Sequence, residues 1–550
     1  MPKLKLGLIP KISISKKKKM EAEEEVWPFK KTVCETLDEA LKEHPYLATY
    51  LESLPEKPKY TLNLDLEEKE TNLLYPLGLG IYVHIDVGGE IGKYNIIEPE
   101  KPASRLLDEI ETAVAKLIED REYPGKKEMV LAGLFKQAVR KMVKIPKDKD
   151  ESAILYHFLR EKIGHGFIDG FLADPWLEDV SIPGEGKVFV YHKMFGHLET
   201  NVYVSKDEIN RLLRNIAERY GKVLSYTHPI IDIHLPDGSR FNIVYGEDIS
   251  LRGSNFTIRK FPKEPISVTQ LIRWKTLSPE LASYLWMLFE VGVSAMVCGE
   301  TASGKTTTLN ALTCFINSDS KIVSIEETPE INIFHKNWIR EVTRLHTGVP
   351  VTMFDLLKAA LRQRPDYIIV GEIRGEEGRV AFQAIETGHP VLSTMHAGTL
   401  GQLFQRLTSY PIDVPKTHID GLNLAIFQAR MERGKRFIRR VTSINEIIGY
   451  EPEEGRLNYL PTFIYDPDLD KIRFTGSSFH LETKVLTFRG WGKERLKELY
   501  DELRARAEIL SFLSENFPKY GDLWKTVIAV REKGVWEIYR RVKEMKIPWE

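Results

Sequence analysis

The chain has 550 residues, of which 29% are charged and 42% are hydrophobic, and its formal net charge at pH 7 is -1. This length predicts two to four domains with at least one large core, and the near-zero charge argues against a protein that binds nucleic acid over its whole surface. Its three cysteines, Cys34, Cys298 and Cys314, form no C-x-x-C pair, which argues against a disulfide framework or zinc ribbon and favours a reducing cytoplasm.

The first 30 residues carry four lysines at 16–19, followed by a cluster of glutamates. They lack the long apolar core and cleavage site of a secretory signal. We therefore expect residues 1–30 to form a charged mobile tail, with contact between its lysines and an anionic membrane surface or a partner as the alternative.

Residues 31–150 combine helical patterns with short β-like runs. We expect helices at 32–54, 103–122 and 128–143, and a strand at IYVHID, residues 81–86. The polar stretch 144–152 is the expected boundary of this region.

Residues 151–260 mix helix and strand patterns, which predicts a mixed α/β domain. Residues 187–191 alternate like a strand, 207–220 have the apolar spacing of an amphipathic helix, and Asp237-Gly238 marks a turn before a strand. The segment FPKEP then contains two prolines, which predicts a linker over 261–266.

Apolar strands alternate with helices from 267 to 450, at 294–298, 322–325, 367–371 and 391–395. Strands without polar alternation, separated by helices, indicate a parallel sheet covered on both faces. The apolar run 282–299 is interrupted by Glu290, so we expect it to lie in the core and not in a membrane. Residues 451–550 change to short strands and charged helices, which predicts a C-terminal extension.

The first apolar strand leads directly into Gly299-x-x-x-x-Gly304-Lys305-Thr306. Glycines let successive backbone N–H groups approach a phosphate, and the following helix points its positive end at the same group. We expect Lys305 to reach the β- and γ-phosphates and the Thr306 hydroxyl to ligate Mg²⁺. The expected nucleotide-binding residues are Gly299, Glu300, Thr301, Ala302, Ser303, Gly304, Lys305, Thr306 and Thr307.

Three other strands of this region end in polar side chains. Glu372 follows DYIIVG, where a carboxylate can hold Mg²⁺, and the alternative is a surface glutamate after a core strand. Glu326 and Glu327 follow another strand, where one can act as a base or orient water, and the alternative is a solvated loop. His389 and His396 flank 391–395 at a spacing that fits no common zinc site. His396 is a candidate γ-phosphate contact, with a structural core histidine as the alternative.

In chain order, GETASGKT, SIEETPEI, RPDYIIVGEIRG and TGHPVLSTMHAGT resemble the Walker A, Asp box, Walker B and His box of the secretion-ATPase superfamily. These are the hexameric motors of type II secretion, type IV pili, the archaellum and VirB11-like systems. The resemblance is specific over 235–407 and looser over 100–515. The wording of PVLSTMHAGT and NFTIRK is most similar to the archaellum and archaeal pilus branch, and the tetracysteine element common in bacterial assembly ATPases is absent from this sequence.

The resemblance implies an α/β fold with a RecA-like P-loop core, a mixed α/β N-terminal domain and ATP bound between them. It assigns the catalytic glutamate to Glu326, while the next position, usually Asp, is Glu327 here. It also implies arginines of the N-terminal domain that reach the nucleotide, and Arg240 in DGSR and Arg259 in FTIRK match those segments. Taken as plain residues, both are more often surface cations.

We therefore predict a cytoplasmic Mg²⁺-dependent ATP hydrolase, peripherally associated with the inner face of the membrane. The resemblance implies a homo-oligomeric ring, taken as a hexamer, that acts through a polytopic membrane platform protein and accessory components. Such a ring would power assembly or rotation of an archaellum, or assembly of a pilus or secretion filament.

The alternatives are a DNA-transfer or packaging motor and a nucleotide-gated scaffold without turnover. The strong basic cluster RMERGKRFIRR at 430–440 is the feature that could support a DNA motor. We expect it to form an exposed face near a ring contact or an anionic membrane surface, and do not expect nucleic acid as a partner.

Overall fold

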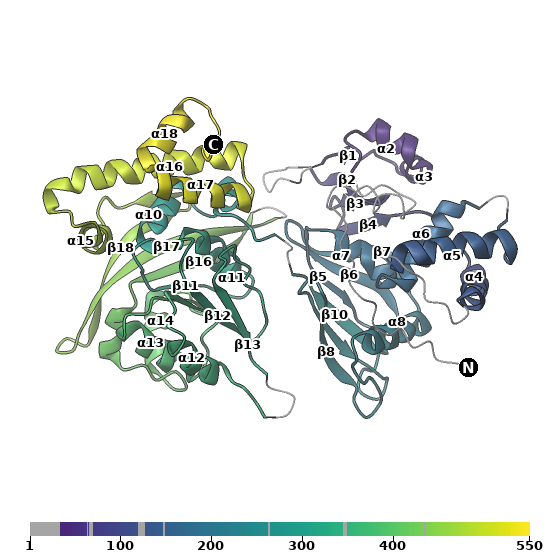
Figure 1. Cartoon of the computed structure of the whole chain (residues 1–550), viewed down its shortest axis with the longest axis horizontal. Helices are drawn as coiled ribbons and strands as arrows, with labels where there is room; N and C mark the ends of the chain where they lie inside the picture. The colour runs from purple at the N-terminus through teal and green to yellow at the C-terminus, as the bar shows by residue number, and fades with distance from the viewer. Residues whose placement is uncertain are drawn as a thin grey trace. The chain divides into compact units, whose positions relative to one another are not determined.

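The computed structural model describes residues 33–550, except 63, 65–69, 119–126, 147–148, 262–263, 345–348 and 434–435. The chain divides between Lys260 and Phe261 into an N-terminal unit and a C-terminal unit (Figure 1). The predicted tail over 1–30 and two positions of the predicted linker over 261–266 lie outside the described residues.

The N-terminal unit contains a ten-stranded sheet in the order β1-β2-β3-β4-β7-β6-β5-β10-β9-β8. Its strands are β1 (Lys59–Tyr60), β2 (Asn72–Gly78), β3 (Ile81–Asp86), β4 (Lys93–Ile97), β5 (Leu177–Ile182), β6 (Gly186–His192), β7 (Gly196–Val204), β8 (Ile230–His234), β9 (Arg240–Val244) and β10 (Asn255–Arg259). Its helices are α2 (Leu37–Glu43), α3 (Pro45–Glu52), α4 (Ser104–Leu117), α5 (Lys127–Lys141), α6 (Glu151–Lys162), α7 (Asp169–Ala173) and α8 (Lys206–Arg219).

Two boundaries predicted from the sequence differ from those that the structure shows in this unit. The single helix expected over 32–54 is broken at His44, which has φ -131° because it precedes Pro45, and a residue before proline is disfavoured in helical geometry. The expected division at residue 150 lies inside the unit, since β4 pairs with β7 and α4, α5 and α6 share one hydrophobic core.

The C-terminal unit contains a nine-stranded sheet in the order β13-β12-β14-β15-β11-β16-β17-β18-β19. Neighbouring strands are parallel from β13 to β16 and antiparallel from β16 to β19. The strands are β11 (Ala295–Cys298), β12 (Ile322–Glu326), β13 (Trp338–Val342), β14 (Tyr367–Val370), β15 (Val391–Met395), β16 (Leu424–Arg433), β17 (Arg436–Glu451), β18 (Arg456–Asp466) and β19 (Lys471–Phe474). This confirms the predicted parallel sheet and the α/β fold class with a RecA-like core.

Helices cover both faces of this sheet (Figure 1). They are α9 (Val268–Arg273), α10 (Pro279–Phe289), α11 (Lys305–Leu312), α12 (Met353–Leu361), α13 (Glu377–Glu386), α14 (Leu400–Thr408), α15 (Leu486–Arg489), α16 (Leu496–Asn516), α17 (Tyr520–Lys533) and α18 (Val535–Lys543). Along β11, Ala295 and Val297 join the core beneath α10 and α16, whereas Met296 and Cys298 join the core beneath α12, α13 and α14. Both sides of the strand are therefore apolar, which explains why its sequence does not alternate.

The apolar run 282–299 belongs to this core, as expected. Every residue of α10 from Leu281 to Phe289 is buried, and β11 follows inside the sheet. In the described part of the chain, no helix combines the length and apolar character needed to cross a bilayer. The expected extension 451–550 is part of the same unit, because β17 runs to Glu451 and pairs with β18, while α16 packs on α9 and α10.

Candidate functional site

The strands β11, β12, β14 and β15 are parallel neighbours in one sheet. The P-loop follows β11, Glu326 ends β12, Glu372 follows β14 and His396 follows β15. The C-terminal ends of parallel strands lie at one edge of a sheet, where α/β proteins bind their ligands. The sheet therefore collects on one edge the four motifs that the sequence singled out.

The P-loop backbone adopts a conformation that glycine makes accessible. Gly304 has φ +92° and Ala302 has φ +63°, both in the left-handed region that L side chains rarely adopt. A Cβ atom at Gly299 would lie 2.2 Å from the carbonyl oxygen of Gln428, so no side chain fits there. Gly304 is the N-cap of α11 and provides no side-chain cap, which leaves the first N–H groups of the helix available to an anion.

Lys305, the first residue of α11, folds back over this loop. Its Nζ donates a hydrogen bond to the Glu300 carbonyl oxygen at 3.0 Å, and Ser303 Oγ donates to the same oxygen at 2.8 Å. Burial lowers the pKa of Lys305, while the nearby Glu372 carboxylate opposes that shift. Of the other predicted contact residues, Glu300 and Thr301 are exposed, and Thr306 and Thr307 are half-buried in the first turn of the helix.

Glu326 is 1% exposed, although it carries a carboxylate. Its Oε1 accepts hydrogen bonds from the backbone N–H groups of Glu330 at 2.7 Å and Ile331 at 2.8 Å. Oε2 has no hydrogen-bond partner among the described residues and lies 3.6 Å from Nε of Arg340. Burial raises the pKa of Glu326 to about 7. Glu327 is exposed, so one of the two adjacent glutamates is buried and the other lies at the surface.

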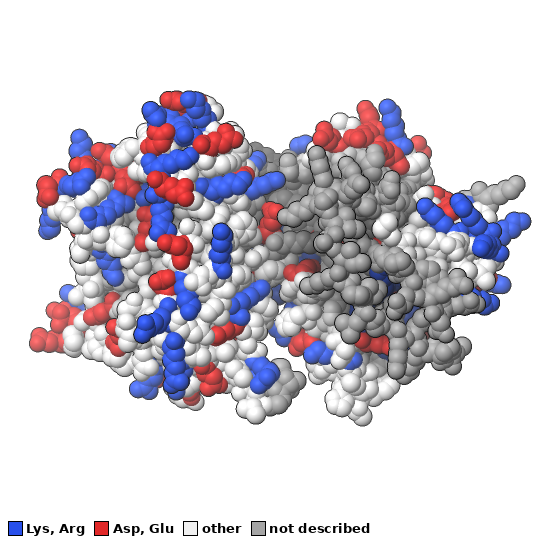
Figure 2. Space-filling view, viewed as in Figure 1, with Lys and Arg blue, Asp and Glu red and all other residues white. Residues whose placement is uncertain are grey.

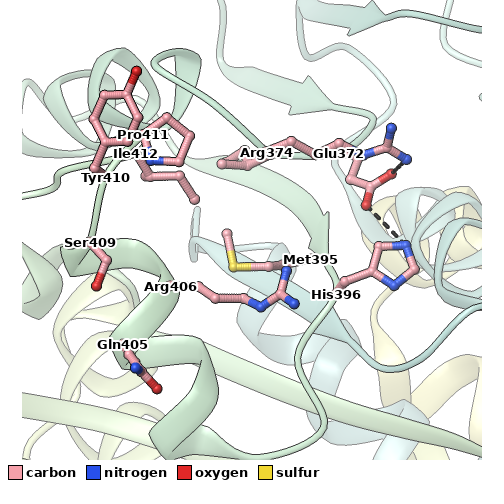
Figure 3. A pocket seen from close by; sticks show the side chains of 11 residues that line it. Glu372, Arg374, Met395, His396, Gln405, Arg406, Ser409, Tyr410, Pro411 and Ile412 are labelled. Carbon is pink, nitrogen blue, oxygen red and sulfur yellow. Dashed lines mark hydrogen bonds and ion pairs between the residues drawn. The ribbon is translucent and has the colours of Figure 1, made fainter.

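Glu372 contacts an arginine of its own loop and a histidine that follows the neighbouring strand (Figure 3). Its Oε2 accepts a hydrogen bond from Nη2 of Arg374, and Oε1 lies 3.2 Å from Nε2 of His396. Burial and Lys305 lower the pKa of His396, with Glu372 opposing them, so the imidazole is held toward its neutral form. The same side chains border a pocket of about 660 Å³, lined by Glu372, Ile373, Arg374, Met395, His396, Gln405, Arg406, Ser409, Tyr410, Pro411 and Ile412.

His389 lies at the opposite end of β15 from this site. Its Nδ1 is 3.2 Å from Oγ1 of Thr387, and it lies before the first residue of the strand. The two histidines of the TGHPVLSTMH segment are therefore separated by the length of the strand, and His396 is the one at the P-loop edge.

The two candidate arginines lie in the N-terminal unit, on adjacent strands. Arg240 begins β9 and Arg259 ends β10, and the antiparallel register places them directly opposite each other. Nε and Nη2 of Arg240 donate to the two carboxylate oxygens of Asp232, each at 3.2 Å, and Asn242 Nδ2 supports that carboxylate at 3.0 Å. Directly opposite residues point to the same side of a sheet, so the pair forms a basic spot on one face.

Two residues that the motifs did not identify also contact the P-loop. Nε2 of Gln428, on β16, donates to the Ser303 carbonyl oxygen at 2.7 Å, and Nε of Arg439, on β17, donates to the Ala302 carbonyl oxygen at 3.1 Å. They lie more than a hundred residues after the loop in the chain, so no local pattern links them to it.

The basic cluster 430–440 is only in part the exposed face that we expected. Arg440 is 5% exposed, and both it and Arg433 form ion pairs with Asp470 at 2.7 Å. Arg439 lies against the P-loop, and the Arg430 guanidinium lies 4.5 Å from the centre of the Phe437 ring. Positions 434–435 lie outside the described residues. The expectation was wrong for Arg440, which is buried, and for Arg439, which is half-buried, whereas Arg430 and Arg433 are exposed as expected.

The side chains at this edge match the ligand preferences of Mg²⁺, which takes carboxylate and hydroxyl oxygens. Oε1 of Glu372 has no hydrogen-bond partner in the described residues, although Nε2 of His396 lies 3.2 Å away. The Thr306 hydroxyl lies on the first turn of α11. Glu372 and Thr306 are thus the residues that fit a magnesium ion.

The chain matches a family model and is similar to several known proteins. The family model described as "Type II/IV secretion system protein" matches residues 177–425. An uncharacterized protein of Methanocaldococcus jannaschii is 41% identical over 539 residues, which cover 91% of this chain and 97% of that protein. The protein VirB11 of Agrobacterium fabrum is 27% identical over 268 residues, covering 44% and 77%. The X-ray structure of the Legionella pneumophila ATPase DotB is similar at 18% identity and a TM-score of 0.39, covering 66% of this chain and 95% of that one.

Proposed function

Because this chain belongs to the type II/IV secretion system protein family, the secretion-ATPase superfamily, we propose that it is a Mg²⁺-dependent ATPase that powers filament assembly or secretion. The observation that carries this proposal is the shared sheet edge. An uncapped P-loop helix, a buried glutamate with a raised pKa and a carboxylate suited to a metal are assembled there.

Each side chain has a distinct role in the proposed phosphoryl transfer to water. Lys305 leaves the Glu300 carbonyl and neutralises charge on the β- and γ-phosphates. Glu326 orients the attacking water and accepts its proton through Oε2, the oxygen without a hydrogen-bond partner. When bound, Mg²⁺ would neutralise phosphate charge, held by Thr306 and Glu372.

The remaining contacts are proposed on the same basis. His396 reports the state of the γ-phosphate through its contact with Glu372. Arg240 and Arg259 stabilise the charge that develops on the phosphates, in the same chain or across a subunit boundary, because guanidinium groups can bind two phosphate oxygens at once.

For the cellular role, we propose a homo-oligomeric ring, most simply a hexamer, at the cytoplasmic face of a membrane. It would act on a polytopic platform protein and accessory components to assemble or rotate an archaellum, or to assemble a pilus or secretion filament. The support is the resemblance of the PVLSTMHAGT and NFTIRK segments to the archaellum and archaeal pilus branch.

A DNA-transfer motor is the second candidate, since VirB11 and a conjugal transfer protein are among the relatives. Such a motor would use a basic groove with interleaved aromatic side chains. The described arginines of the 430–440 cluster are instead engaged within the C-terminal unit. On the face that Figure 2 shows, basic and acidic side chains alternate over this unit. Both observations favour the secretion or filament motor.

The test is phosphate release from ATP by the purified full-length chain, with Mg²⁺ and with excess chelator. We expect turnover that the chelator abolishes, and more stimulation by vesicles containing anionic lipid than by single- or double-stranded DNA. Nucleotide binding without turnover in any condition would identify a nucleotide-gated scaffold. Stimulation by DNA alone would favour the DNA motor.

A further inference from the structure

The β16–β17 hairpin contacts the P-loop from outside the four motif segments. At Phe427 and Gln428 the pairing between the two strands shifts register, and such a bulge changes the direction of a side chain. Gln428 is 3% exposed, and its Nε2 lies 2.7 Å from the Ser303 carbonyl oxygen. Arg439 reaches the preceding carbonyl, that of Ala302, at 3.1 Å.

These contacts fix the orientation of two peptide planes. In a trans peptide, the C=O and the next residue's N–H point in opposite directions. Holding the Ser303 carbonyl therefore turns the Gly304 N–H away from Gln428, and holding the Ala302 carbonyl turns the Ser303 N–H away from Arg439. Ala302, at φ +63°, lies in the left-handed region that non-glycine residues rarely adopt, so contacts from outside the loop help to keep this conformation.

The two N–H groups that result are available to a ligand. The Ser303 N–H makes only a long bond to the Glu300 carbonyl, at 3.3 Å, and within the described residues no hydrogen bond engages the Gly304 N–H. The hairpin also closes the outer side of the loop. A Cβ atom at Gly304 would lie 3.0 Å from Nε2 of Gln428 and 3.1 Å from Cδ of Arg439.

Only the donor end of the Gln428 carboxamide has a hydrogen-bond partner among the described residues. Oε1 of Gln428 is buried without a hydrogen-bond partner among the described residues, which is unfavourable. An apolar side chain of the same size would avoid that cost but would leave the Ser303 carbonyl oxygen without this donor, so the use of the amide lies in its donor.

We propose that Gln428 and Arg439 are positioning residues of the phosphate cradle. By holding the carbonyls of Ser303 and Ala302, they turn the N–H groups of Gly304 and Ser303 toward the β-phosphate of a bound nucleotide. The proposal rests on the proposed nucleotide site. The β-phosphate is common to ADP and ATP, so the two residues contribute to the binding of both nucleotides and less to the chemical step.

The experiment compares the full-length wild-type chain with Gln428→Leu, Arg439→Gln and Arg439→Lys. Arg430→Gln is the matched control, because Arg430 lies opposite Arg439 in the hairpin and its loss removes the same charge. The measurements are the Kd for ADP, the KM and kcat for ATP, and the thermal midpoint of the nucleotide-free protein.

We expect the three test variants to raise the Kd for ADP and the KM for ATP about tenfold, the effect of one lost hydrogen bond, with kcat lowered less than threefold. Lysine does not rescue position 439, because it lacks the Nε donor, and Arg430→Gln binds like wild type. Unchanged ADP affinity in the test variants overturns the proposal. So does rescue by lysine, an equal loss in Arg430→Gln, or a lowered kcat at unchanged KM.

Should Gln428→Leu not fold, the comparison of Arg439→Lys with Arg430→Gln decides alone, because both substitutions keep a long polar side chain in the hairpin. Failure of the proposed function is a separate result: the wild-type chain would then bind no ADP and hydrolyse no ATP.

Discussion

Oε1 of Glu372 lies 3.2 Å from Nε2 of His396, across the ends of the neighbouring parallel strands β14 and β15. The Walker B-like and His box-like segments are therefore in contact through these two side chains. Because the pKa of His396 is lowered by burial and by Lys305, the contact joins a carboxylate to a largely neutral imidazole at pH 7. The histidine thus lies against the carboxylate without neutralising it.

His396→Ala should lower the affinity for Mg²⁺ and so raise the Mg²⁺ concentration that ATP turnover requires. Removing the imidazole leaves Arg374 as the remaining described contact of the Glu372 carboxylate, and loss of such an outer contact lowers metal affinity about tenfold. The measurement is the Mg²⁺ concentration that gives half-maximal ATPase activity. His389→Ala, at the other end of the same strand, is the control and should leave that concentration unchanged. Equal effects of the two substitutions would contradict a specific role for His396.

Lys305→Ala should abolish turnover. The backbone cradle remains in this variant, but no side-chain cation offsets the charge of the γ-phosphate, and we expect a loss of about 10²- to 10³-fold in kcat. Lys358→Ala is the control, because that lysine lies over the Phe354 ring on α12, outside the P-loop edge. Near-normal hydrolysis by Lys305→Ala would mean that the P-loop is not the active site.

Glu326→Gln should bind ATP but not hydrolyse it. The amide oxygen can still accept the N–H groups of Glu330 and Ile331, so the loop keeps its shape, but an amide cannot take a proton from water. Glu327→Gln, its exposed neighbour, is the control and should retain turnover. The reverse result, with Glu327→Gln inactive and Glu326→Gln active, would assign the base to Glu327.

Glu372→Gln should weaken Mg²⁺ binding more than it weakens nucleotide binding. A neutral amide is a poorer Mg²⁺ ligand than a carboxylate, so the Mg²⁺ concentration needed for half-maximal activity should rise, and a higher concentration should restore part of the rate. Loss of activity that no Mg²⁺ concentration restores would argue for a different role of this side chain.

The buried state of Glu326 predicts a pH-dependent stability. Burial raises its pKa from 4.5 to about 7, so between these values the folded chain binds a proton that the unfolded chain does not. The free energy of unfolding of the nucleotide-free protein should therefore fall as pH rises through this window, by up to about 3 kcal/mol. Glu326→Gln should not show this fall in the free energy of unfolding, because an amide does not titrate in this range. A difference between wild type and Glu326→Gln that stays constant from pH 4.5 to 7 would show that the carboxyl titrates normally.

Local patterns were sufficient to predict the sheet and its ligand edge. The apolar strands and the P-loop are contiguous segments, and parallel pairing brings their ends together without further information. Distant pairings were not predictable in this way. Gln428 reaches the P-loop through the pairing of β16 with β11 and a shift in register, and Arg440 is buried because Asp470, thirty residues later, pairs with it. The sequence shows a polar or charged residue at each of these positions, but it does not identify the residue that the side chain contacts.

Arg240 and Arg259 are predicted to act together on the phosphates. Like charges directly opposite each other in a ladder are unfavourable, and Asp232 compensates Arg240 at a side-chain exposure of 43%. A bound phosphate would offset the positive charge of both arginines, because each guanidinium can bind two of its oxygens at once. Each Arg→Ala variant should bind nucleotide but lose about 10³-fold in rate, and Arg→Lys should restore little.

Mixed rings separate action within a chain from action between chains. Arg240→Ala and Lys305→Ala chains are each expected to be inactive alone. If Arg240 serves the nucleotide of a neighbouring subunit, some interfaces of a mixed ring pair an intact arginine with an intact P-loop, and phosphate release partly returns. The control mixes Lys305→Ala with Glu326→Gln, which lie in the same unit, and should stay inactive if those two residues act on one nucleotide within one chain. Rings confirmed as mixed that recover no activity would place Arg240 in the active site of its own chain, or outside the site altogether.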